Sequence, residues 1–104
     1  MKIWMDDVRP APEGYCWIKT VDGAKETIIK LDNSINRKWW GEVEIIDIDH
    51  DAGDYVQYGG DYIKLLDWLE ETSRNYPIRI HSMNPVGVAN MRAIIKRNGW
   101  IEVK

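Results

Sequence analysis

The stretch Ile45-Ile46-Asp47-Ile48-Asp49-His50-Asp51 decides the predicted fold of this chain. With Val43 it forms a nearly continuous β-branched run, which is typical of a strand covered on both faces. The run ends in acids and a histidine, at the end of the strand where open α/β sheets place their chemistry. Asp47 points away from Ile46 and Ile48, and the sequence leaves its role open. We therefore predict a central strand that carries functional side chains at its end.

A second acidic pair ends another predicted strand. Lys2 to Met5 is a short apolar run, and Asp6 and Asp7 follow it directly. If this strand lies parallel to the central one and beside it, Asp6, Asp7 and Asp49 meet at one rim. Carboxylates at one site favour a hard cation, so we predict Mg²⁺ or Mn²⁺ there, with Asp51 behind these ligands. The alternative is that exposed acids only cap loops and helix dipoles.

The remaining elements predict an α/β fold in which strands alternate with helices. Such alternation implies right-handed parallel crossovers in a three-layer sandwich. Polar residues 32–41 are expected to be a connection, and prolines 10 and 12 exclude a helix after the first strand. We expect a five-stranded parallel sheet and about three helices. The expected strands cover residues 2–5, 15–20, 43–48, 78–81 and 100–103, and the expected helices begin at Thr20 or Asp22, near Asp61, and at Asn84-Pro85.

Composition places the chain among ordinary globular proteins. Its 104 residues predict one domain, with 44% hydrophobic and 30% charged residues. The net charge of -3 argues against an extended nucleic-acid surface. Cys16 is the only cysteine, which excludes an internal disulfide and favours a reducing, cytoplasmic location. No apolar run approaches the roughly 20 residues of a membrane span. Because acids follow by residue 6, we do not expect residues 1–6 to belong to a signal peptide.

Five further side chains at the ends of predicted strands suit phosphate chemistry. His50 and His81 are the only histidines and both are candidates to move a proton, alongside Asp49 as a catalytic carboxylate. The acids beside His50 favour its protonated form, which suits a general acid. Arg9 can clamp a phosphate or form a surface ion pair. Ser82 and Asn84 can contact phosphate oxygens, although helix capping also explains Asn84.

The tryptophans admit two interpretations. Trp39, Trp40 and Trp68 can stack on a nucleobase. Packing in the core and under a loop is the simpler expectation.

Three motifs together resemble a known family. Residues Trp4-Met5-Asp6-Asp7-Val8-Arg9-Pro10, Asp49-His50-Asp51 and His81-Ser82-Met83-Asn84-Pro85 are similar to the bacterial and phage domains called cyclic-phosphate processing receiver domains. In that resemblance the acid pair, Asp49 and Ser82 match the acid pair, phosphoacceptor and switch hydroxyl of response-regulator receivers. It implies a receiver-like, flavodoxin-like fold and the handling of cyclic or terminal phosphates of RNA or nucleotides.

The chain also departs from signalling receivers. Lys104 does not match the lysine that they carry after the last strand, a Pro-rich loop is expected in place of the first crossover helix, and no helix is expected after residues 100–103. We expect metal-dependent processing or binding of a phosphate ester, with a small phosphate compound or an RNA end as ligand. The alternatives are a non-catalytic regulatory or partner-binding receiver, with Asp49 as phosphoacceptor, and a decoy that binds a nucleotide signal.

Overall fold

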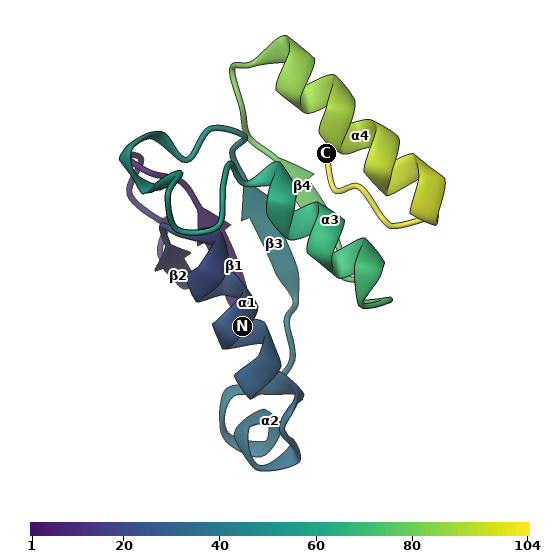
Figure 1. The fold of residues 1–104 in the computed structure, drawn as a ribbon. Helices are drawn as coiled ribbons and strands as arrows, with labels where there is room; N and C mark the ends of the chain where they lie inside the picture. The colour runs from purple at the N-terminus through teal and green to yellow at the C-terminus, as the bar shows by residue number, and fades with distance from the viewer.

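The computed structural model describes residues 1–104 and contains one parallel sheet with four α-helices (Figure 1). The strand order is β2-β1-β3-β4, and each neighbouring pair is parallel. All four strands therefore end at the same edge of the sheet. The elements are β1 (Lys2–Met5), β2 (Tyr15–Ile18), α1 (Val21–Asp32), α2 (Ser34–Trp40), β3 (Ile45–Ile48), the 3-10 turn η1 (Gly53–Tyr55), α3 (Ile63–Glu71), β4 (Ile78–Ile80) and α4 (Pro85–Asn98).

The predicted adjacency of the two acid-bearing strands is confirmed. β1 and β3 pair in parallel, with Met5 opposite Ile48. The residues that follow these two positions leave the sheet at the same edge. The starts of α1 and α4 are also as predicted. The side chain of Thr20 accepts a hydrogen bond from the Gly23 amide, and that of Asn84 accepts one from the Gly87 amide.

The predicted fifth strand is wrong. Residues 100–103 pair with β4 only through a single bridge between Ile78 and Glu102. The Ile78 amide donates to Ile101 at 2.9 Å, and the Val103 amide donates to Ile78 at 2.7 Å. Because β4 has three residues and only its first one is bonded in this way, no strand forms.

The polar connection predicted for residues 32–41 contains a fourth helix instead. Asn33 caps α2 by accepting the Ile35 amide at 3.0 Å, and no residue of α2 is buried. Figure 1 shows α2 beyond the end of the sheet at which β3 begins. Trp39 and Trp40 are therefore 76% and 65% exposed, so the expectation that they pack inside is wrong. Trp68 is partly buried, under the guanidinium of Arg74.

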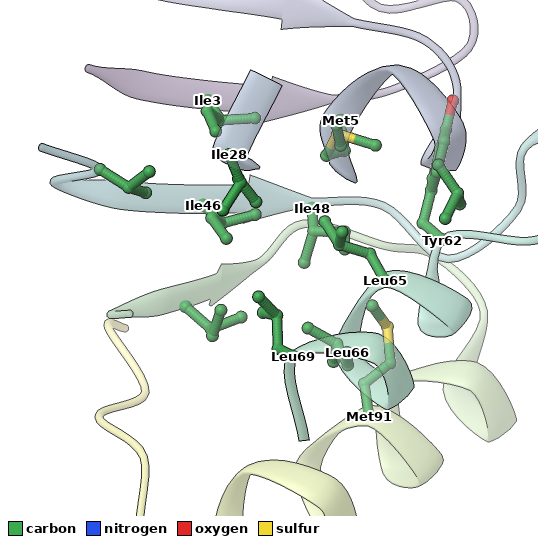
Figure 2. Packing of buried hydrophobic residues seen from close by; sticks show 14 of the residues in the cluster. Ile3, Met5, Ile28, Ile46, Ile48, Tyr62, Leu65, Leu66, Leu69 and Met91 are labelled. Atoms are coloured by element: carbon green, nitrogen blue, oxygen red, sulfur yellow. The ribbon is translucent and has the colours of Figure 1, made fainter. Parts of the chain in front are cut away.

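The hydrophobic core lies on one face of the sheet. Ile3, Met5, Ile46 and Ile48 alternate along their strands and point toward the helices (Figure 2). α1, α3 and α4 all contribute buried residues to this one cluster. The second helical layer of the predicted three-layer sandwich is absent.

A loop occupies the opposite face, because the connection from β1 to β2 is Pro-rich and cannot form a crossover helix. The indole of Trp4, which points to this face, donates to the carbonyl oxygen of Arg9 at 2.9 Å. Residues 6–14 thus return across the sheet without regular secondary structure. None of the helices has the length and apolar character that a bilayer crossing requires.

A bidentate ion pair joins α3 to α4. Arg97 donates to both carboxylate oxygens of Glu70, at 2.8 and 2.9 Å, and Asn98 donates to the same carboxylate. The hydrogen bonds from Arg97 and Asn98 lower the pKa of Glu70 to about 2. Because the folded-state pKa lies below the ordinary 4.5, the pair stabilises the fold above that pH and stops doing so as the pH falls to about 2.

We therefore expect Glu70→Gln to lower the thermal unfolding temperature at pH 7 but to change it little at pH 2. Thermal unfolding followed by circular dichroism across this pH range measures the difference. Glu71→Gln is the control, since Glu71 is exposed and forms no ion pair. An equal destabilisation of the Glu70 variant at both pH values would contradict the expectation.

Candidate metal and phosphate site

Three carboxylates meet at the edge of the sheet where the strands end. Asp6 and Asp7 follow β1, and Asp49 follows β3. One oxygen from each lies within 4.8 Å of the others. Asp6 is buried, whereas Asp7 and Asp49 are partly exposed. The three acids therefore lie together at one rim of the sheet, as the sequence predicts.

The electrostatics of this cluster are strongly negative. Burial raises the pKa of Asp7, and the charges of Asp6 and Asp49 raise it further. The pKa of Tyr62 is also raised, by burial and by the same three acids. Tyr62 is fully buried, and its hydroxyl donates to the carbonyl oxygen of Lys19 at 2.9 Å. Such mutual repulsion is relieved when a cation binds among the carboxylates.

Asp6 is held more rigidly than the other two acids. Its Oδ1 accepts the amides of Val8 and Arg9, at 2.9 and 2.8 Å. Its Oδ2 lies 3.0 Å from Nε2 of His81. Burial opposes the ionisation of Asp6, but the two amide bonds and His81 outweigh it and lower the pKa. The Asp6 carboxylate is consequently ionised and held in one orientation.

The residues at this edge fit a hard divalent cation. Their donors are carboxylate oxygens, which Mg²⁺ and Mn²⁺ prefer. The Asp7 carboxylate also packs directly against Gly53. A Cβ atom on Gly53 would lie 2.2 Å from Asp7 Oδ2, so a larger residue does not fit there. Gly53 has φ +55°, so the loop after β3 brings bare backbone against this carboxylate.

A pocket of about 250 Å³ opens beside the acids. Asp49 and Asp51 line it, together with the three residues predicted to contact phosphate, Arg9, Ser82 and Asn84. The guanidinium of Arg9 makes no bidentate contact with the protein, because its closest carboxylate oxygen, on Asp6, is 4.0 Å from Nε. The hydroxyl oxygen of Ser82 accepts the Asn84 amide at 3.2 Å, which leaves the hydroxyl proton available.

The two histidines have different surroundings. Nδ1 of His50 lies 2.8 Å from Oδ1 of Asp51 and 3.5 Å from Nδ2 of Asn84, two residues that line the pocket. The other ring nitrogen of His50 has no hydrogen-bond partner in the protein. His81 lies deeper, between two acids: Nδ1 is 2.6 Å from Asp47 and Nε2 is 3.0 Å from Asp6. His50 is therefore the histidine with a nitrogen left for a ligand.

Comparison with protein families agrees with the three motifs. A family model described as the cyclic-phosphate processing receiver domain matches residues 1–97. The chain belongs to this family. No curated protein and no solved structure matches it.

Several residues of this cyclic-phosphate processing receiver domain were not predicted to contribute to the site. Gly53 and Gly87 lie so close to site residues that only glycine fits at either position. A Cβ atom on Gly53 would overlap Asp7, and one on Gly87 would lie 2.4 Å from Cγ of His50. Glycine is unfavourable inside a helix, so Gly87 in the first turn of α4 was the sequence signal that could have indicated a close contact there. Asp47 was singled out but had no assigned role, and Arg79, which pairs with it at 3.0 Å, was not considered.

Proposed function

We propose that this receiver domain binds a phosphate ester beside Asp49 and processes it with Mg²⁺ or Mn²⁺ held by Asp6, Asp7 and Asp49. One observation supports this most: three carboxylates within 4.8 Å adjoin a pocket lined by Arg9 and Ser82. The family description makes a cyclic phosphate the favoured substrate, either on a nucleotide or at an RNA end. Because Cys16 is free and exposed, a reducing, cytoplasmic location is part of the proposal.

Residues in and beside the pocket have separate tasks in hydrolysis. The cation, when bound, offsets the negative charge of the phosphoryl oxygens. Arg9 donates from its guanidinium to two of these oxygens, and Ser82 donates its hydroxyl proton to one. Hydrolysis breaks one P–O bond, adds the hydroxide of water to phosphorus and adds its proton to the leaving oxygen. His50, held by Asp51 through Nδ1, takes or gives that proton at Nε2.

The first experiment is calorimetric titration of Mg²⁺ and Mn²⁺ into the wild-type protein. Incubation with 2′,3′-cyclic nucleotides and the bound metal follows, with ³¹P NMR to detect ring opening and EDTA as the control. We expect metal binding and metal-dependent ring opening. If no metal binds, the proposal fails. If metal binds without turnover of any cyclic nucleotide, the catalytic part of the proposal fails.

A regulatory receiver is the second candidate. It is favoured by the position of Asp49 and Ser82 in one pocket, where a phosphoryl group on Asp49 would meet the hydroxyl. Beryllofluoride with Mg²⁺ mimics such a group. Stable binding of this analogue with a change in oligomeric state, measured by light scattering, would support the regulatory function. Turnover of a phosphate ester would count against it.

Displacement of His50 tests its role in proton transfer. Gly87→Ala places a methyl group against the His50 ring, while the backbone of α4 accepts alanine. We expect Mn²⁺ affinity to be kept and turnover to fall by about 10- to 100-fold, since positioned acid–base groups contribute on the order of 100-fold or more. Asn90→Ala, on an exposed position of the same helix, should leave turnover unchanged. Unchanged turnover in the Gly87 variant would exclude His50.

A further inference from the structure

A buried carboxylate lies outside the acidic cluster but is connected to it. Asp47 is in the middle of β3 and is 1% exposed. Each of its oxygens has a nitrogen partner: Nη1 of Arg79 is 3.0 Å from Oδ2, and Nδ1 of His81 is 2.6 Å from Oδ1. A carboxylate buried on a sheet face is costly unless it is paired in this way. An apolar side chain at this position would need no such partners.

His81 bridges Asp47 and Asp6 with its two ring nitrogens. Each ring nitrogen of His81 therefore lies within hydrogen-bond distance of a different buried carboxylate. Trp4 fixes the plane of the ring, because the two rings stack at 3.8 Å with 6° between their planes. The imidazole has neither a free nitrogen nor freedom to rotate.

These contacts form a continuous chain of side chains from the metal site to the surface. Its members are Asp6, His81, Asp47 and Arg79, whose side chain is 47% exposed. At the inner end His81 takes the Asp6 oxygen that the backbone amides leave free. The orientation of the Asp6 carboxylate thus depends on a histidine that Asp47 holds from behind.

We propose that Asp47 is a positioning residue of the metal site, and that it acts through His81 to fix Asp6. The inference rests on the proposed cation site and assigns His81 the task of holding Asp6, which leaves proton transfer to His50. Residues behind metal ligands typically change metal affinity by about 10- to 100-fold when they are replaced. Asp47 would therefore set the cation affinity without touching the cation.

Mn²⁺ titrations of single and double variants test the route. We expect Asp47→Asn to weaken Mn²⁺ binding by about 10-fold or more, and to change it by less than about twofold when His81→Gln is already present. Asp32→Asn is the control, because it removes the same charge from a residue paired with Arg74 outside the site. An equal loss in both backgrounds would mean that Asp47 acts through its charge alone, which overturns the proposal. Circular dichroism checks that each variant is folded.

The wild-type protein provides a second test that needs no variant. In ¹⁵N NMR spectra, Mg²⁺ should shift the Nε2 signal of His81, which lies 3.0 Å from Asp6. An unchanged Nε2 signal in a protein that binds Mg²⁺ would overturn the proposal and leave the cation site standing. If the wild-type protein binds no metal, the proposed function fails and this inference fails with it.

Discussion

Asp49→Asn should abolish metal-dependent turnover and weaken Mn²⁺ binding by more than about 100-fold. Asp49 supplies one of three carboxylates within 4.8 Å, and it also lines the pocket where the phosphate is expected. Replacing a residue behind the metal ligands typically changes metal affinity by about 10- to 100-fold, so replacing the ligand Asp49 itself should have a larger effect. The fold should persist, because the asparagine Oδ1 can still accept the His50 amide that Asp49 accepts at 2.7 Å. Calorimetry with Mn²⁺ and the cyclic-nucleotide assay measure both effects.

The matched control for this variant is Asp67→Asn. It removes the same charge from α3, where Asp67 makes only a 3.9 Å pair with Lys64. Metal binding and turnover should remain at the wild-type level in the control. If Asp49→Asn keeps its Mn²⁺ affinity, the acids do not form a cation site and the mechanism proposed for this pocket is wrong.

Gly53→Ala should weaken Mn²⁺ binding by at least about 10-fold although it changes no ligand. The added methyl group would overlap the Asp7 carboxylate, since a Cβ atom there lies 2.2 Å from Oδ2. The carboxylate has to leave its position among the three acids. Alanine at φ +55° also strains the backbone by about 1–2 kcal/mol, so the unfolding temperature should fall as well.

Gly99→Ala separates these two effects. Gly99 ends α4 at φ +66°, and a Cβ atom there contacts nothing within 4 Å. Both variants should therefore lose a similar amount of thermal stability, while only the Gly53 variant loses Mn²⁺ affinity. Equal Mn²⁺ affinity in the two variants would show that Asp7 does not bind the cation.

The sequence predicts the acidic rim well because strand ends are encoded locally. Asp6-Asp7 and Asp49 each follow a short apolar run, and parallel pairing of β1 with β3 is enough to bring them together. The start of α4 is equally local, since Asn84 and Pro85 specify a cap and a first turn by themselves.

Features that depend on several distant elements were not predictable in the same way. The role of Asp47 requires the order of three strands, because its partner His81 follows β4 and the next carboxylate follows β1. α2 has no buried residue, so no apolar periodicity indicated it. The single helical layer follows from the short connection between β1 and β2, whose path only the structure gives.

That connection has a fixed length, unlike most surface loops. Arg9 in this connection makes three separate contacts. Its amide donates to Asp6, its carbonyl oxygen accepts from the Trp4 indole, and its side chain lines the pocket. Surface loops ordinarily tolerate insertions. Here an added residue would shift Arg9 out of register with one or more of these partners. Among homologous chains, gaps in alignment should therefore fall elsewhere, in the segment around α2.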